Sequence, residues 1–107
     1  MVLDKKSAAH EKGHAIEHEV SFKVEARRNK LLGLWIAENF GYTGKAAEDY
    51  AVEVIHSDME EPGIEDVLRK IMNDIAANNV NISEDRIREK IDEFEKIARG
   101  QIEAERP

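Results

Sequence analysis

The chain has 107 residues, enough for one domain with a modest hydrophobic core. Its 16 basic and 23 acidic residues give a net charge of -7, which disfavours nucleic acid as a partner because phosphate binding needs a basic surface. There is no cysteine, so disulfides, thiolate zinc sites and cysteine nucleophiles are excluded. No apolar run approaches the ~18 residues of a membrane span, and we expect a cytoplasmic protein without direct membrane insertion.

Helix-breaking residues divide the sequence into four stretches with helical periodicity. The first ends at Phe40, because Gly41 suits a C-cap with positive φ. Its apolar stripe is formed by Val20, Val24, Leu31 and Trp35, and Leu32, Leu34 and Ile36 widen it near its end. The second stretch begins after Thr43, a candidate N-cap. Its expected buried face is formed by Ala47, Tyr50, Ala51, Val54 and Ile55.

The third stretch follows the turn at Pro62-Gly63 and ends at Asn78-Asn79. Its stripe is Ile64, Val67, Leu68, Ile71, Met72 and Ile75. Ser83 is the expected N-cap of the fourth stretch. Its stripe is Ile87, Ile91, Phe94, Ala98 and Ile102. Four such stripes predict an all-α fold, a small antiparallel four-helix bundle.

The first helix is longer than its partners can cover. Starting near Ser7 it would hold about 34 residues and extend about 51 Å, against about 24 Å for the second helix. The segment before Val20 has few large apolar residues and contains Gly13. We therefore expect residues 1–19 to form a flexible N-terminal segment and residues 20–104 the bundle. The segment is either an idle tail or a recognition element that becomes helical against a partner.

Residues 10–14 read H-E-x-x-H, a spacing at which a helix presents two imidazoles to zinc. The motif lies near the start of the chain, contains Gly13 and follows no predicted strand, so we interpret it as a chance match. We predict no metal site and no enzymatic activity. The alternative, a zinc hydrolase, requires stoichiometric metal that survives chelation, whereas adventitious binding of Zn²⁺ or Ni²⁺ by His10, His14 and His18 does not.

Arg27, Arg28 and Lys30 form a basic cluster on the first helix. Such side chains either pair with acids of neighbouring helices or hold a phosphate group or the acidic rim of a partner. The phosphate interpretation leads to a second hypothesis, a bundle that binds or senses a purine nucleotide. Three neighbouring polar residues, His56-Ser57-Asp58, are interpreted as a solvated helix end. There is no Gly-rich phosphate loop, and no cofactor is expected.

A longer pattern, F-K-V-E-A-R-R-N-K-L-L-G-L-W, occupies Phe22–Trp35. It resembles the small alpha-proteobacterial proteins that include the zeta subunit, the inhibitor of the F-type ATP synthase. The resemblance continues through G-Y-T-G at residues 41–44, E-E-P-G at residues 60–63 and I-S-E at residues 82–84. It covers roughly residues 17–104, essentially the whole expected bundle.

The resemblance implies a four-helix bundle that blocks ATP hydrolysis by inserting its N-terminal segment at a catalytic interface between the α and β subunits. It also implies a bacterial protein held peripherally at the inner membrane through the synthase. The family's inhibitory segment reads F-E-x-x-F-x-x-D-E-E-L-x-F. The corresponding partner-binding residues of this chain are His10, Glu11, His14, Glu17, Glu19 and Phe22.

His10 and His14 depart from this pattern, because each stands where the family has Phe. A buried aromatic anchor is often worth ~2–4 kcal/mol in an interface, which corresponds to roughly 30–1000-fold in affinity. A neutral imidazole retains part of the ring contact. The departure therefore leaves three outcomes open: a weak inhibitor, a pH-dependent inhibitor, or a bundle that has lost inhibition.

Overall fold

The computed structural model describes the backbone of residues 2–58 and 63–106, and the side chains of residues 20–58 and 63–106. This part of the chain forms four helices and no strand: α1 (Val2–Asn39), α2 (Lys45–Ser57), α3 (Glu65–Ala77) and α4 (Glu84–Glu105). The predicted all-α small bundle is confirmed. Within the described ranges, no helix combines the length and apolar character that crossing a membrane requires.

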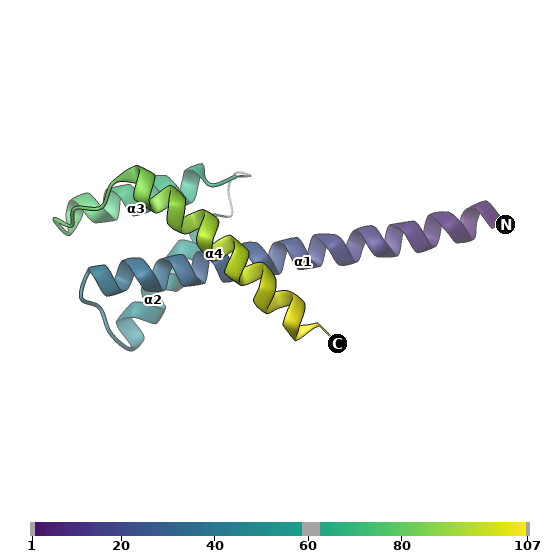
Figure 1. Cartoon of the computed structure of the whole chain (residues 1–107), viewed down its shortest axis with the longest axis horizontal. Helices are drawn as coiled ribbons and strands as arrows, with labels where there is room; N and C mark the ends of the chain where they lie inside the picture. The colour runs from purple at the N-terminus through teal and green to yellow at the C-terminus, as the bar shows by residue number, and fades with distance from the viewer. Residues whose placement is uncertain (1, 59–62, 107) are drawn as a thin grey trace.

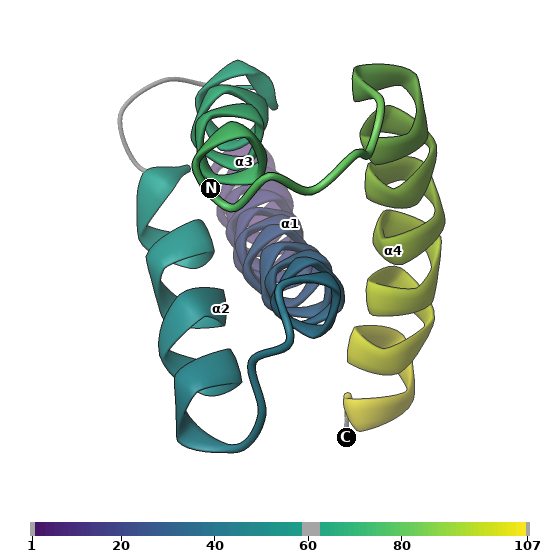
Figure 2. The ribbon, with the colours of Figure 1, turned by 90° about the vertical axis from the view of Figure 1, so that its left-hand side faces the viewer.

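α1 is the central and longest element. The other three helices surround its C-terminal half, and α4 crosses it obliquely (Figures 1 and 2). The helix begins at Val2, earlier than the expected start near Ser7, and its N-terminal half projects beyond α2, α3 and α4. The molecule consequently measures 63 × 26 × 21 Å. The side chains of residues 1–19 lie outside the described residues. The predicted flexibility of this segment and its boundary at residue 19 therefore stay predictions.

Two helices end as the sequence predicts. Gly41 follows α1 with φ of 80°, and Asn79 follows α3 with φ of 55°. After α1, the N–H of Tyr42 donates to the carbonyl of Ala37 at 2.9 Å, and that of Gly41 donates to Glu38 at 3.0 Å. These two bonds form a Schellman motif, which satisfies carbonyls that the helix itself leaves free.

The starts of α2 and α4 differ in how well the sequence predicts them. Ser83 caps α4 as expected, since its hydroxyl accepts from the N–H of Arg86 at 3.1 Å. The prediction of Thr43 as the cap of α2 is wrong. Gly44 occupies that position with φ of 55°, and no side chain hydrogen-bonds to the cap. A positive φ is readily adopted by glycine, which therefore takes the place of a hydroxyl cap.

The buried face of α1 is formed by one side of the predicted stripe. Val24, Leu32 and Ile36 are fully enclosed, whereas Trp35 and Leu31 are only partly buried. The reason is Gly33, which faces α2: a Cβ at this position would lie 2.7 Å from the Cα of Ala51. The close approach of the two backbones centres the interface on Gly33 and leaves Trp35 beside it.

The other apolar stripes lie where the sequence places them. Tyr50, Ala51 and Val54 of α2 are buried. α3 buries Val67, Leu68, Ile71 and Ile75, and α4 buries Ile87, Ile91, Ala98 and Ile102. The main cluster joins all four helices, while a smaller cluster of Val24, Ala98 and Ile102 fixes the crossing of α1 and α4. The bundle thus holds α1 from Val20 to its end.

Candidate functional site

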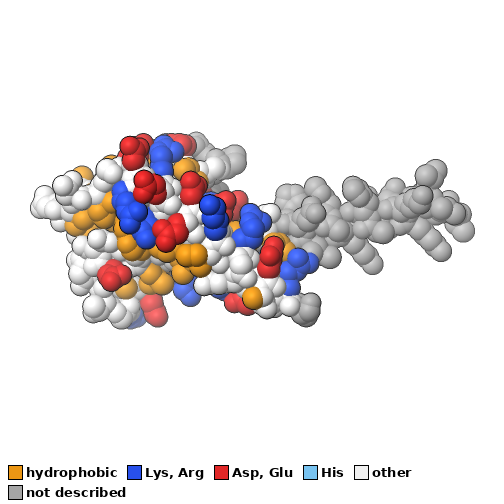
Figure 3. Space-filling view, in the orientation of Figure 1, with side chains coloured by type: hydrophobic (Ala, Val, Ile, Leu, Met, Phe, Trp, Pro, Cys, Tyr) orange, Lys and Arg blue, Asp and Glu red, His pale blue; other side chains and the backbone are white. Residues whose placement is uncertain are grey.

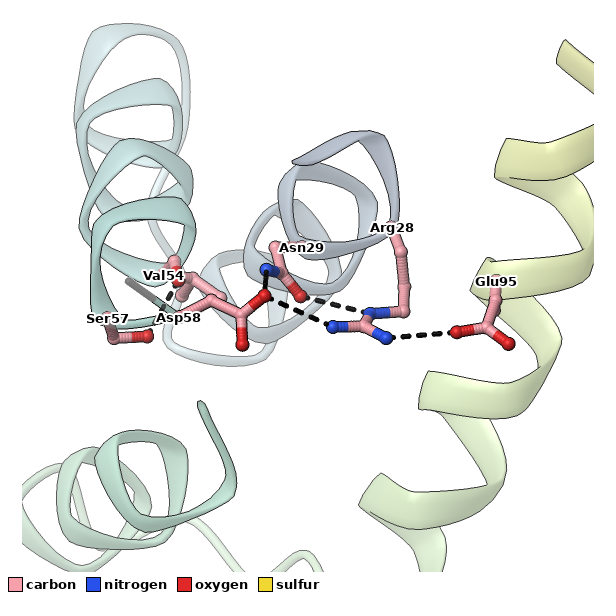
Figure 4. Close-up of polar contacts among 6 residues, drawn as sticks. All are labelled: Arg28, Asn29, Val54, Ser57, Asp58 and Glu95. Carbon is pink, nitrogen blue, oxygen red and sulfur yellow. Dashed lines mark hydrogen bonds and ion pairs between the residues drawn. The ribbon is translucent and has the colours of Figure 1, made fainter. Parts of the chain in front are cut away.

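A partly buried ionic network joins α1 to the end of α2 and to α4 (Figure 4). The guanidinium of Arg28 donates to Glu95 at 2.9 Å and reaches Asp58 at 3.5 Å. The side-chain amide of Asn29 donates to the same oxygen of Asp58 at 3.0 Å, and its carbonyl accepts from Nε of Arg28 at 3.1 Å. Both residues of α1 are buried and both are hydrogen-bonded, as buried polar groups must be.

The three basic side chains of the cluster on α1 differ in their exposure to solvent. Arg28 belongs to the network, and Arg27 donates to Gln101 at 2.8 Å and to Glu105 at 3.0 Å. Lys30 lies exposed. On the face seen in Figure 3, basic and acidic side chains are interspersed over the bundle. The geometry of Arg27 and Arg28 favours pairing with neighbouring acids, and a phosphate contact at this cluster stays a prediction.

Three residues of the network, Asn29, Asp58 and Glu95, were not predicted from the sequence. The interpretation of residues 56–58 as a solvated helix end holds for His56, which is exposed, and is wrong for Asp58, whose side chain is only 10% exposed. Asp58 is withdrawn from solvent because Arg28 and Asn29 reach it from the neighbouring helix. The sequence contains one indication of this network: Arg28 and Asn29 are polar residues within the apolar stripe from Val24 to Leu32, and buried polar groups need partners.

Phe22 lies where α1 leaves the bundle, and it is 73% exposed. A groove of about 480 Å³ runs beside it, with an apolar floor of Phe22, Ala26 and Ile55. Glu25, Asn29 and Asp58 are among its polar residues. A second groove of about 390 Å³ shares the same three apolar side chains and is bordered by Lys23 and Lys30. The seam of α1 and α2 therefore presents a concave, partly apolar surface next to the N-terminal half of α1.

The other predicted partner-binding side chains, His10, Glu11, His14, Glu17 and Glu19, lie outside the described residues. Their backbone belongs to the part of α1 that projects from the bundle. The H-E-x-x-H motif lies there too. Among the side chains that the structure describes, no group of three or more His, Asp or Glu is placed to hold a metal ion.

Tyr50 is the one tyrosine within the core. Its hydroxyl donates to Asp74 at 2.8 Å, and Lys70 donates to the same oxygen at 3.0 Å. Burial, together with this bond to a carboxylate, raises the pKa of Tyr50 well above its ordinary value. The group is held neutral and serves packing, which agrees with the structural role predicted for it.

These features define a small helical protein that presents one long helix from a compact support. The family model of ATPase inhibitor subunit zeta matches residues 1–101, and the chain belongs to that family. The family resemblance found in the sequence is thereby confirmed.

A solved structure supports the same fold. A protein determined by solution NMR is 44% identical to this chain, covers 79% of it and 96% of its own length, and superposes with a TM-score of 0.71. None of the curated proteins compared with the chain matches it.

Proposed function

We propose that this protein inhibits ATP hydrolysis by the F-type ATP synthase, inserting the N-terminal half of α1 at a catalytic interface between an α and a β subunit. The observation that carries the proposal is the continuity of α1. One helix runs from Val2 to Asn39, while the bundle packs around its second half. A family of ATPase inhibitors supports the regulatory role, and the projecting half of α1 is the part available to a partner.

The continuity of α1 also lowers the free-energy cost of holding its N-terminal half helical on binding. The first turn of an isolated helix is unfavourable to form, whereas each later residue adds one hydrogen bond. The packed part of α1, from Val24 onward, already supplies that nucleus. Residues 2–19 continue this helix in the structure, so they can meet the synthase as a helix without forming a nucleus of their own. The bundle of residues 20–104 is the scaffold of this element.

The contact residues of the proposed element are His10, Glu11, His14, Glu17, Glu19 and Phe22. His10 and His14 replace two family phenylalanines, so the proposal includes weaker inhibition than a chain with both aromatic anchors would give. The partners are the α and β subunits, and the protein is held at the bacterial inner membrane only through the synthase.

A photo-crosslinking amino acid at position 14 tests this proposal on the purified catalytic head. We expect crosslinks to the α and β subunits that competing unmodified protein suppresses. The same probe at Ile97, an exposed position on α4, is the matched control and should give little product. Crosslinks from position 97 but not from position 14 would contradict insertion of the N-terminal half of α1.

The purine-nucleotide alternative has its own test, a titration of ATP followed through backbone amide shifts. Saturable shifts at Arg27, Arg28 and Lys30 would support it. The pairing of Arg28 with Asp58 and Glu95 weighs against it, because a phosphate would have to displace a buried carboxylate.

A further inference from the structure

We propose that the groove between Phe22 and Asp58 is a second docking site on this protein, which takes an aliphatic side chain and an adjacent Arg or Lys from the surface of the ATP synthase head. This inference rests on the proposed function and extends it from the N-terminal half of α1 to the bundle. The occupant is defined by the groove itself, which combines an apolar floor with the carboxylate of Glu25 at its edge.

The floor is suited to an apolar side chain. Phe22, Ala26 and Ile55 line both neighbouring grooves, so one apolar strip crosses from α1 to α2. Phe22 is the most exposed of the large apolar side chains that the structure describes. Docking would remove this ring from water, and buried aromatic anchors of this kind dominate interface energies.

The polar rim of the groove is formed by Glu25, Asn29, His56 and Asp58, and it offers a carboxylate to a cation. Glu25 is exposed and lines the groove, and the carboxylate of Asp58 lines it from the end of α2. Asp58 is already paired with Arg28, which leaves Glu25 as the carboxylate available to a partner.

The groove is preformed. Asn29 and Asp58, which line it, are fixed by the hydrogen bond between them at 3.0 Å and by Arg28. A site held in its binding shape loses little side-chain freedom on association. Its position matters as well, because Phe22 follows Glu19 by three residues, or about 4.5 Å along the helix. A partner surface that contacts α1 as far as Glu19 therefore lies next to the groove.

The test compares two charge reversals on α1 in the full-length chain. Glu25→Lys alters the groove, and Glu38→Lys makes the same change in net charge at an exposed position 13 residues further along the helix. We expect Glu25→Lys to weaken both binding to the purified head and inhibition by ~10-fold, with a smaller salt dependence, while Glu38→Lys stays within about twofold.

Removal of the apolar floor is the second arm. Ile55→Ala should weaken binding by ~5-fold or more, whereas Ile97→Ala, an exposed apolar position that lines neither groove, should not. A melting temperature for each variant verifies that the bundle is intact.

The outcomes separate the two proposals. Equal affinities for Glu25→Lys and Glu38→Lys, with inhibition by the wild-type chain, would overturn the groove and leave the proposed function standing. Absence of binding by the wild-type chain would overturn both. If Glu25→Lys abolished self-association of the chain and left binding to the head unchanged, the occupant would be a second copy, which also overturns the proposal.

Discussion

The guanidinium of Arg28 on α1 lies 2.9 Å from the carboxylate of Glu95 on α4, and its other end reaches Asp58 at the end of α2. One side chain thus connects three helices at the point where α1 enters the bundle. The side chain of Arg28 is 6% exposed and that of Glu95 is 43% exposed, so the pair runs from the interior to the surface. This arrangement leads to the first prediction.

Replacing Arg28 by Met should destabilise the bundle by about 3–5 kcal/mol, because it leaves the carboxylate of Asp58 enclosed without its cation. Arg27→Met removes the same charge from a pair that is open to water, Arg27–Glu105, and should cost about 0.2–1 kcal/mol. Urea unfolding followed by circular dichroism measures both. Similar losses for the two variants would show that the Arg28 network adds little to stability.

Two glycines provide a test of the contact between α1 and α2. Gly33→Ala should destabilise by about 1–3 kcal/mol, since the added methyl would meet the backbone of Ala51. Gly100→Ala, within α4, adds its methyl to open space and should stabilise by about 0.5–1 kcal/mol. Thermal melts of the pair give the signs directly. A stabilising Gly33→Ala would contradict the close approach of the helices.

Alkaline conditions should destabilise the fold through Tyr50. Its raised pKa keeps it neutral in the native state, whereas in the unfolded chain a tyrosine loses its proton near pH ~10. The contribution of neutral Tyr50 to stability is therefore complete below about pH 10. It is lost as the pH rises further, because the native state then binds more protons than the unfolded state. Unfolding free energies measured across about pH 9 to 11.5 should fall more steeply for the wild type than for Tyr50→Phe. Parallel slopes would show that Tyr50 ionises freely.

Inhibition should strengthen as the pH rises from about 6 to 8. An imidazole in water titrates near pH ~6.5, and a neutral ring fills an apolar pocket better than a charged one, which loses its hydration there. In this proposal His10 and His14 occupy positions of apolar anchors. The variant with both His10→Phe and His14→Phe should inhibit more strongly at every pH and lose most of the pH dependence.

A control separates these residues from the third histidine of the segment. His18→Gln should keep the pH dependence of the wild-type chain, because position 18 holds an acidic residue, not an aromatic one, in the family pattern. Inhibition that strengthens toward acidic pH would mean that carboxylates of the synthase receive charged imidazoles, and the apolar pockets would be ruled out.

The sequence was sufficient for the helices and for the apolar residues of their buried faces. Local chemistry determines these features: Gly41 and Asn79 adopt positive φ, and Ser83 caps a helix with its hydroxyl. Which side of the α1 stripe is buried most deeply could not be predicted from periodicity alone, because it depends on the contact between Gly33 and Ala51, 18 positions apart in sequence. The large ring of Trp35 suggested a deeper position than the helix packing allows.

The candidate site was predictable only in part. A contact surface formed by His10, His14 and Phe22 is a prediction from the family resemblance. The Arg28 network escaped because Asn29, Asp58 and Glu95 are distant in sequence and each is common on helix surfaces. The groove beside Phe22 escaped for the same reason: its floor requires Ile55 of α2 to lie against α1.

The measurement that tests the central claim most directly is ATP hydrolysis by the cognate catalytic head with increasing amounts of two proteins, the full chain and a chain lacking residues 2–19. The described core residues all lie after that deletion, so both should melt at similar temperatures. We predict saturable inhibition by the full chain and none by the shortened one. Equal inhibition by both, or no inhibition by the full chain at large excess, would contradict the assignment of inhibition to the N-terminal half of α1.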